Sequence, residues 1–290
     1  MQVGEFPLKD KVVVVTGGGS GINAKFVKRA ADLGAKVVVA DLALTPEAQH
    51  YVDNESKIVF QKTDVSKWDQ LQRLVSVSKE HFGSTPDVYV AGAGVFEPED
   101  ESYAQVHINL SHPIKLSRIA MRTLVSENRK GVILPFASIG GIAGSYNCPL
   151  YIACKHGVVG FVKSMKFLEK YEGIKVVTIC PGAVDTPLWS QEKRERTDFH
   201  KIAALDADDV AKAMIDLVQD GKYVGGTLLE IMPNDGAKTR VIPDWNIDPP
   251  KGGSLTNADP NSTEIPAAFR EMKQVMDRER GMSGKGTNGE

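Results

Sequence analysis

The sequence predicts an α/β protein whose core is a doubly wound parallel sheet in a single domain. Two observations lead to this prediction. Between about residues 11 and 231, strand-length apolar runs alternate with helix-length stretches of mixed polarity, and such alternation places helices on both faces of a parallel sheet. The first run, residues 11–16, reads Lys-Val-Val-Val-Val-Thr, a β-branched stretch typical of a strand buried on both faces.

The remaining elements follow in order from the same alternation. A turn and a helical pattern lead from the first strand to a second one at residues 35–40, which makes a strand-turn-helix-strand unit. Further strands are expected at residues 58–61, 88–91, 132–136, 174–180 and, as the last one, 227–231. Helices are expected at residues 22–33, 68–82, 102–125, 150–170 and 208–219.

The chain changes character after Ile242. Residues 1–242 show no break in composition and are expected to form one domain, whereas the first part of the segment 243–290 is rich in Pro, Gly, Asn and Asp, as in a loop. Residues 263–280 can form one amphipathic helix, and residues 281–290 are expected to be disordered. The helix packs either on the domain or on a partner subunit, or the segment is a mobile tail.

Charge and composition exclude several classes of function. The net charge is −2, and Lys and Arg are spread along the chain, which argues against a nucleic-acid surface. We find no signal-peptide pattern and no apolar run long enough for a membrane span. The three cysteines (148, 154 and 180) are expected to be reduced thiols, and the six histidines show no metal-ligand spacing. We therefore expect a cytoplasmic protein without a metal site.

A glycine-rich turn follows the first expected strand. It reads Gly-Gly-Gly-Ser-Gly over residues 17–21 and leads directly into a helical pattern. Glycines let the backbone approach a pyrophosphate closely, and the helix N-terminus favours its negative charge. Asp41 ends the second strand about 20 residues further on, where dinucleotide sites carry an acidic residue. Its carboxylate would bind a ribose 2′-hydroxyl and repel a 2′-phosphate, so we expect NAD(H) rather than NADP(H).

A second group of polar residues lies in the middle of the chain. Tyr151 and Lys155 stand four residues apart in an expected helix, so they share one face of it. Ser138 follows the strand run that begins at Val132, at the carboxyl end of that strand. A nearby ammonium favours the phenolate of a tyrosine, which can then act as a proton acceptor. Taken alone, the same spacing also suits a half-buried tyrosine and a solvated lysine.

These features occur together in one wider pattern. Thr-Gly-Gly-Gly-Ser-Gly-Ile at residues 16–22 is followed by Ser138, by Tyr-x-x-x-Lys at 151–155 and by Pro-Gly at 181–182. The joint pattern resembles the short-chain dehydrogenase/reductase family over residues 8–232. Within that family the chain looks most like NAD-dependent 15-hydroxyprostaglandin dehydrogenases. The resemblance implies a Rossmann fold and hydride transfer between NAD(H) and a secondary alcohol or ketone.

The resemblance also implies which residues contact the cofactor. They are Gly17, Ser20, Gly21, Ile22, Asp41, Asp64, Val65, Ala91, Gly92, Tyr151, Lys155, Pro181, Val184 and Thr186. The chain departs from the family pattern in two motifs of this site. The third glycine of T-G-x-x-x-G-x-G is Asn23 here, and N-N-A-G reads Ala-Gly-Ala-Gly at residues 91–94. We interpret them as features of a divergent but working cofactor site.

Four catalytic residues are implied in the same way. Tyr151 is expected to be the acid/base, with its pKa lowered by the ammonium of Lys155 and by the positive oxidised nicotinamide ring. Lys155 is also expected to hold the nicotinamide ribose. Ser138 is expected to orient the substrate oxygen, and Asn109 to support a water chain that leads from Lys155. Outside this pattern, Ser138 would be an ordinary strand-end cap and Asn109 a satisfied helix amide.

The substrate side is less defined. Residues 186–203 correspond to the family's mobile lid, and bulky apolar side chains there suggest a hydrophobic substrate; the alternative is a surface helix with ordinary core contacts. Substrate contacts are expected at Ser138, Tyr146, Cys148 and Trp189. Cys148 stands where prostaglandin dehydrogenases carry a Gln, which weakens the prostaglandin interpretation.

Two functions from different classes are thus considered. The first is an NAD-dependent oxidoreductase acting on a small-molecule alcohol or ketone, without nucleic-acid or membrane partners. The second is a catalytically silent NAD-binding protein that acts through conformation or partners, which the intact catalytic set disfavours. By analogy with the family, helices near residues 111–126 and 150–170 form a subunit interface, so a homodimer or homotetramer is expected.

Overall fold

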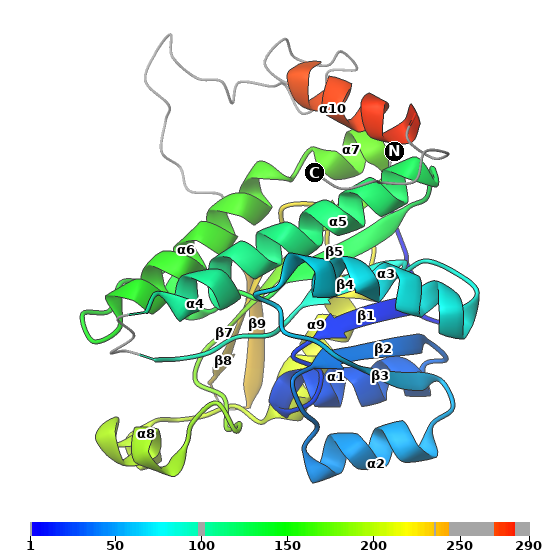
Figure 1. The fold of residues 1–290 in the computed structure, drawn as a ribbon. Coiled ribbons are helices and arrows are strands. Elements are labelled where there is room, and N and C mark those ends of the chain that lie inside the picture. Colours follow the sequence, from blue (N-terminus) through cyan, green and yellow to red (C-terminus); the bar gives the residue numbers. More distant parts are fainter. Residues whose placement is uncertain (1, 98–101, 235, 244–269, 282–290) are drawn as a thin grey trace, which may run out of the picture.

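The computed structural model describes residues 2–97, 102–234, 236–243 and 270–281 of the 290-residue chain. A six-stranded parallel sheet runs through its centre in the order β3-β2-β1-β4-β5-β6 (Figure 1). This is the predicted doubly wound order, since the chain starts in the middle and extends toward both edges. The strands are β1 (Val12–Thr16), β2 (Lys36–Asp41), β3 (Ile58–Lys62), β4 (Val88–Ala91), β5 (Gly131–Pro135) and β6 (Ile174–Val176).

The six-stranded sheet ends at β6, and a separate three-stranded sheet follows, which the sequence did not predict. The single strand expected at residues 174–180 is divided at Val177 into β6 and β7 (Thr178–Pro181). Strand β7 pairs in parallel with β8 (Leu228–Pro233), which pairs antiparallel with β9 (Ala237–Val241). The strand expected at 227–231 is therefore not the last one. All five residues of β9 are exposed, so this strand lacks the apolar pattern by which strands are recognised.

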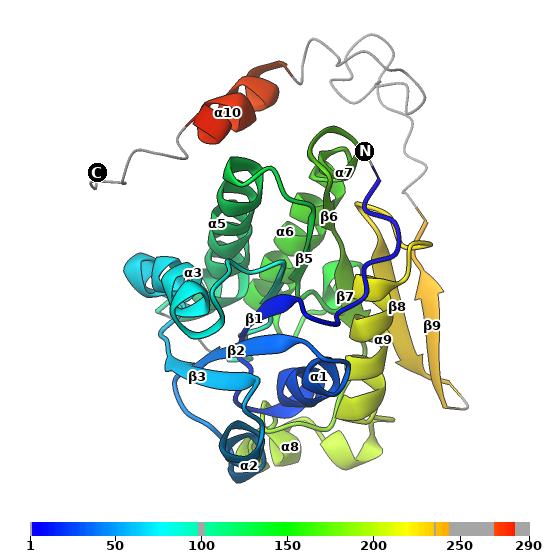
Figure 2. The same ribbon diagram turned by 90° about the vertical axis from the view of Figure 1, so that its right-hand side faces the viewer.

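Helices cover both faces of the sheet. Helices α1 and α9 pack against each other on one face, and α3, α5 and α6 lie on the other (Figures 1 and 2). Strand β1 is buried on both sides. Val13 and Val15 pack in the hydrophobic cluster on the side of α1 and α9, and Val14 packs in the cluster on the side of α3, α5 and α6. The longer helices are α1 (Gly21–Asp32), α2 (Pro46–Asn54), α3 (Trp68–Phe82), α5 (His112–Ser126), α6 (Pro149–Ser164) and α9 (Ala207–Gln219).

Two expected helices differ from the structure in their continuity. The helix expected at residues 102–125 consists of α4 (Ala104–Val106), a π-helical segment at His107–Ser111 and α5. The helix expected at 150–170 ends at Ser164, where the N–H of Met165 binds the carbonyls of Phe161 and Val162 at 3.1 Å each; α7 (Leu168–Glu172) follows. Helix α2 was not predicted; Thr45 caps it, its side chain accepting a hydrogen bond from the N–H of Ala48.

A C-terminal helix lies on the domain. Helix α10 (Arg270–Gly281) falls within the predicted range 263–280 apart from its last residue; residues 263–269 and 282–290 lie outside the described residues. It packs against α5, where Met276 is buried and Arg118 donates to Glu279 at 3.0 Å. Helix α10 thus covers part of α5, one of the helices expected at a subunit interface; the oligomeric state stays a prediction. No helix in the described ranges is both long and apolar enough to cross a bilayer.

Candidate active site

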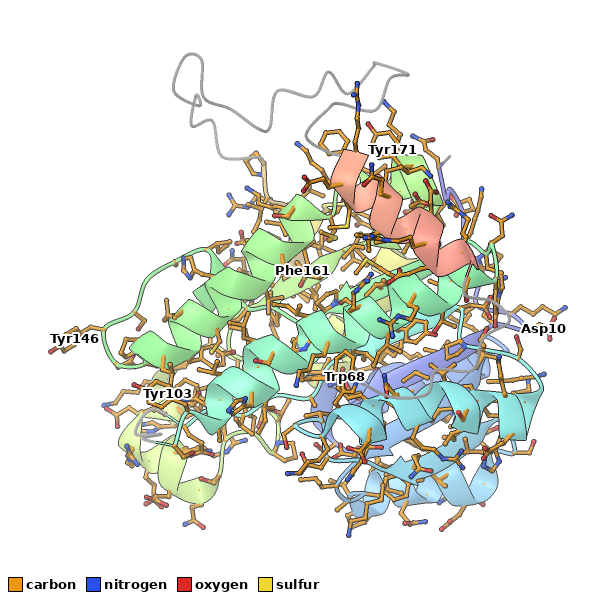
Figure 3. All side chains as sticks on the ribbon, turned by 45° about the horizontal axis from the view of Figure 1, so that its top comes forward. Asp10, Trp68, Tyr103, Tyr146, Phe161 and Tyr171 are labelled. Carbon is orange, nitrogen blue, oxygen red and sulfur yellow. The ribbon has the colours of Figure 1, made fainter. Side chains whose placement is uncertain are left out.

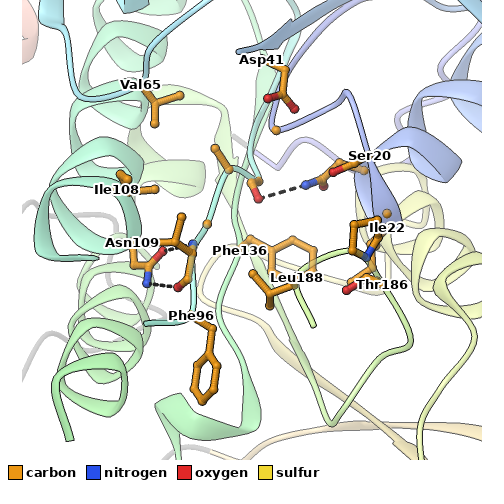
Figure 4. A pocket seen from close by; sticks show the side chains of 18 of the residues that line it. Ser20, Ile22, Asp41, Val65, Phe96, Ile108, Asn109, Phe136, Thr186 and Leu188 are labelled. Carbon is orange, nitrogen blue, oxygen red and sulfur yellow. Dashed lines mark hydrogen bonds between the residues drawn. The ribbon is translucent and has the colours of Figure 1, made fainter. Parts of the chain in front are cut away.

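A pocket of about 430 Å³ opens at the carboxyl ends of β1, β2 and β4. Ligands of open α/β sheets bind at this edge, where the strand order reverses. Figure 4 shows Asp41 and Val65 toward one end of the pocket and Phe96 toward the other. Most of the predicted contacts line it, namely Gly17, Ser20, Gly21, Ile22, Asp41, Asp64, Val65, Gly92, Asn109, Tyr151, Lys155 and Thr186.

The glycine turn is shaped by close approaches of the backbone. Gly17 has φ +69°, and a Cβ there would lie 2.6 Å from the Cα of Ala93. A Cβ on Gly19 would lie 2.2 Å from the carbonyl oxygen of Ala43. The side chain of Ser20, at the N-cap of α1, makes no capping hydrogen bond. An uncapped helix N-terminus behind a glycine turn fits the negative charge of a pyrophosphate.

Asp41 closes the far end of the pocket. Its two carboxylate oxygens accept hydrogen bonds from the N–H of Gly19 at 2.9 Å and from the N–H of Leu42 at 2.7 Å. These bonds fix the carboxylate beside the glycine turn, and Asp64 lines the same end. Among the described residues there, namely Asp41, Leu42, Thr63, Asp64 and Val65, two are acids and none is a cation.

The loop after β4 forms one wall of the pocket and is held from two sides. The N–H of Gly92 donates to the hydroxyl of Thr16 at 3.1 Å, and that hydroxyl also shares a hydrogen bond with Nε2 of His112 at 2.9 Å. Asn109 binds Val95 twice, because its Oδ1 accepts the Val95 N–H at 2.9 Å and its Nδ2 donates to the Val95 carbonyl at 2.7 Å (Figure 4). The side chain of Asn109 therefore clamps this loop.

The catalytic candidates meet at the other end of the pocket. Tyr151 and Lys155 lie on α6, and Nζ of Lys155 is 5.6 Å from the centre of the Tyr151 ring. Lys155 is buried and donates from Nζ to the carbonyl oxygen of Phe136 at 2.8 Å. Ser138, the N-cap of the short 3-10 helix Ile139–Gly141 that follows β5, hydrogen-bonds the Tyr151 hydroxyl. The structure thus brings Ser138, from the segment after β5, together with Tyr151 and Lys155 from α6.

Burial dominates the ionisation of this group. Burial raises the pKa of Tyr151 to about 12, and the hydrogen bond from Ser138 opposes this rise. Burial also lowers the pKa of Lys155 to about 8. In the protein without cofactor, burial is thus the largest influence on the Tyr151 pKa and raises it. The expected lowering by Lys155 together with the oxidised nicotinamide ring stays a prediction for the loaded site.

Aromatic side chains cover the substrate side. The Phe96 ring meets the Tyr151 ring edge to face at 5.1 Å, and Trp189 lies 5.1 Å from Phe96 and 4.8 Å from Phe199. Trp189 and Phe199 belong to the segment 186–203, which contains α8 (Gln191–Arg196). Nζ of Lys193 on α8 pairs with Glu97 at 2.6 Å. The segment is therefore docked on the loop after β4 by stacking and by an ion pair.

Other predicted contacts lie outside the pocket lining. Ala91 and Val184 are buried, Pro181 is the last residue of β7, and Cys148 is buried at the N-cap of α6. Tyr146 is fully exposed, with a relative accessibility of 102%, at the edge of the molecule (Figure 3). Sequence reasoning missed Phe96, Lys193 and His112. No short-range pattern marks these three residues, since each contacts a distant segment, as His112 does through Thr16.

Comparison with known proteins places these features in a family. A family model described as short chain dehydrogenase matches residues 11–197, more than half of the chain. An uncharacterized oxidoreductase of Staphylococcus saprophyticus is 30% identical over 237 residues, which cover 78% of this chain and 98% of that protein. Cis-4-hydroxycyclohexanecarboxylate dehydrogenase of Sinomonas cyclohexanicum is 30% identical over 250 residues, covering 80% and 98%. The rat 15-hydroxyprostaglandin dehydrogenase [NAD(+)] is 30% identical over 249 residues, covering 78% and 92%.

Proposed function

Since the chain belongs to the short-chain dehydrogenase family, we propose that it transfers a hydride between NAD(H) and a hydrophobic secondary alcohol or ketone. One observation carries the proposal. A single pocket is lined by the glycine turn and Asp41 as well as by Tyr151 and the buried Lys155. A dinucleotide lying along this pocket, with its pyrophosphate at the turn, would have its nicotinamide end toward the Tyr151 hydroxyl.

The choice of NAD over NADP rests on charge. A 2′-phosphate beside Asp41 would meet a carboxylate whose position is already fixed by two backbone N–H groups. Asp64 adds a second negative charge at that end, and like charges at close range disfavour binding. The name of the rat relative, 15-hydroxyprostaglandin dehydrogenase [NAD(+)], supports the proposal of NAD(H) rather than NADP(H).

Each catalytic side chain has a role that follows from its place. The nicotinamide ring supplies the hydride acceptor or donor when it is bound. Ser138 orients the substrate oxygen toward the Tyr151 hydroxyl, which it already contacts. Because burial raises the pKa of Tyr151 to about 12, this hydroxyl holds its proton at neutral pH and can donate it to a ketone oxygen. In alcohol oxidation it must ionise first, which a charged Lys155 favours.

The substrate class follows from the aromatic cover. Phe96 and Trp189 stack between Tyr151 and the rest of the lid segment, so a substrate that reaches Tyr151 contacts ring faces and edges. Burial of apolar surface gives about 25 cal/mol per Å², which favours hydrophobic alcohols over small polar ones. We therefore propose a hydrophobic secondary alcohol or ketone as the substrate.

The experiment that tests this function pairs turnover with binding. Hydrophobic secondary alcohols with NAD⁺, and ketones with NADH, are followed at 340 nm for the wild type and for Tyr151→Phe. We expect turnover in the wild type, a loss of about 100-fold or more in Tyr151→Phe and NADH binding within about twofold of the wild type. Tyr171→Phe, on α7 away from the pocket, is the matched control. A wild type that binds NADH but turns over neither substrate class supports the catalytically silent alternative instead.

A further inference from the structure

Two of the positions that depart from the family pattern, Asn23 and Gly92, lie against each other in space. Asn23 is the third residue of α1, is 7% exposed and lines the pocket. Its Nδ2 donates to the carbonyl oxygen of Gly92 at 2.9 Å, which joins residues 69 positions apart in the chain. The residue at the family's glycine position has gained a side chain, and the residue at the family's asparagine position has lost one.

The space at Gly92 is taken by the Asn23 amide. A Cβ on Gly92 would lie 2.4 Å from both Nδ2 and Oδ1 of Asn23, and its three nearest heavy atoms all belong to Asn23. The φ of Gly92 lies outside the left-handed region, so its backbone can accept a side chain. Gly17 differs, because its φ is positive and the backbone of Ala93 blocks it. The nearest obstacle to a side chain at position 92 is therefore a neighbouring side chain, that of Asn23.

The Asn23 amide also holds the wall of the pocket. Thr16 binds the N–H of Gly92, Asn109 binds Val95, and Asn23 adds a third attachment that starts on α1, the helix whose N-terminus faces the pyrophosphate position. The loop so held continues to Phe96, which contacts Tyr151. Asn23 thus connects the phosphate end of the site to the loop that reaches the reaction end.

The burial of the Asn23 side-chain amide is partly unfavourable, so filling space is not a sufficient reason for an asparagine at this position. Oδ1 of Asn23 is buried without a hydrogen-bond partner among the described residues. A buried acceptor without a partner is destabilising, so a residue that only filled space would favour an apolar side chain of similar size. The Nδ2 bond to Gly92 is what an apolar side chain could not supply.

We propose that Asn23 is a positioning residue of the cofactor site and that its role is coupled to the glycine at position 92. The Asn23 side chain, from α1, holds the loop after β4 and fills the space that a side chain at position 92 would otherwise occupy. The proposal rests on the proposed function, since the site that is positioned is the dinucleotide site. It predicts that Asn23→Gly and Gly92→Asn each weaken NADH binding when made alone, and that the double variant binds NADH nearly as well as the wild type.

The test is a double-mutant cycle read by NADH affinity and by ligand-free melting temperature. Asn23→Gly removes one hydrogen bond and should weaken NADH binding about tenfold. Gly92→Asn forces the loop off the Asn23 amide and should weaken it by about tenfold or more. The double variant should return to within about threefold of the wild type, because the loop side chain enters the space that Asn23 leaves.

Controls separate positioning from general stability. Ser78→Ala removes a buried hydroxyl that binds the Leu74 carbonyl at 2.9 Å in α3, so it should lower the melting temperature without changing NADH affinity. If the effects of the two single variants simply add in the double variant, the coupling is wrong although the enzyme still binds NADH. If the wild type binds no dinucleotide, the proposed function and the positioning role fall together.

Discussion

The two ends of the pocket differ in what builds them. At the phosphate end, backbone groups meet at distances that leave no room for a Cβ, as at Gly17 and Gly19, and Asp41 is fixed by two backbone N–H groups. At the substrate end, side chains from distant segments stack on one another, as Phe96, Trp189 and Phe199 do. Tolerance to substitution should therefore differ, since a backbone clash cannot relax as a flexible side chain can.

The largest effect is expected at the phosphate end. In Gly19→Ala the new Cβ would meet the carbonyl oxygen of Ala43 at 2.2 Å, so the turn must shift, and NADH binding should weaken roughly 100-fold. Gly160→Ala is the matched control, because no atom lies within 4 Å of its Cβ position in α6; it should leave binding unchanged. Fluorescence titration with NADH measures both, and equal affinities in the two variants would contradict the backbone account.

A second prediction concerns the buried support beneath the phosphate end. Burial lowers the pKa of His112 to about 4, below the unfolded value of about 6.5, so the folded protein keeps this ring neutral. The buried neutral ring therefore makes its full contribution to the free energy of unfolding above pH 6.5. As the pH falls toward 4, this contribution is lost, by up to about 3 kcal/mol. His112→Gln should be less stable at pH 7 but lose less over that interval in urea titrations. If the free energies of unfolding of the wild type and of His112→Gln fell equally between pH 6.5 and 4, His112 would not be the cause of the loss of stability at low pH.

The third prediction tests charge rather than shape at the same end. Asp41→Ala removes the carboxylate expected at the ribose, so NAD⁺ binding should weaken about 30-fold while NADP⁺ binding improves. The ratio of kcat/KM for the two cofactors measures the change. An unchanged ratio would mean that Asp41 does not select the cofactor and that its bonds to Gly19 and Leu42 are its main role.

The smallest effect is expected at the substrate end. Trp189→Ala removes one ring of the aromatic cover, which should raise KM for a hydrophobic alcohol about tenfold. The neighbouring rings Phe96 and Phe199 remain, and NADH affinity should stay within about twofold. Steady-state kinetics with a long-chain and a three-carbon secondary alcohol provide the comparison. A loss that is equal for both alcohols would indicate a disturbed lid rather than a lost apolar contact.

Much of the fold could be predicted because it depends on local pattern. The β-branched runs mark the strands of the parallel sheet, and α3 (Trp68–Phe82) has the predicted bounds. The differences arise where local pattern is absent or misleading. Strand β9 is exposed throughout, and the run at residues 174–180 remains apolar across the break at Val177. In both cases the strand bounds depend on pairing with distant strands: β9 and β7 pair with β8, whereas β6 pairs with β5.

The site shows the same division. The glycine turn, Asp41, Ser138, Tyr151 and Lys155 were predicted because motifs place them at fixed points of a strand or helix. The rise in the pKa of Tyr151 in the protein without cofactor could not be predicted, because it depends on how folding buries the phenol. The stacking of Phe96 on Tyr151 joins residues 55 positions apart, and no spacing rule connects them.

What the sequence determined by itself is the family, the sheet and the identity of the main polar residues, because periodicity and short motifs are properties of neighbouring positions. What only the tertiary structure decided is which of these residues touch. The contact between Asn23 and Gly92 brings together two departures from the family pattern that lie far apart in the sequence. The physical reason is that packing and hydrogen bonding act over a few ångströms in space, irrespective of the distance along the chain.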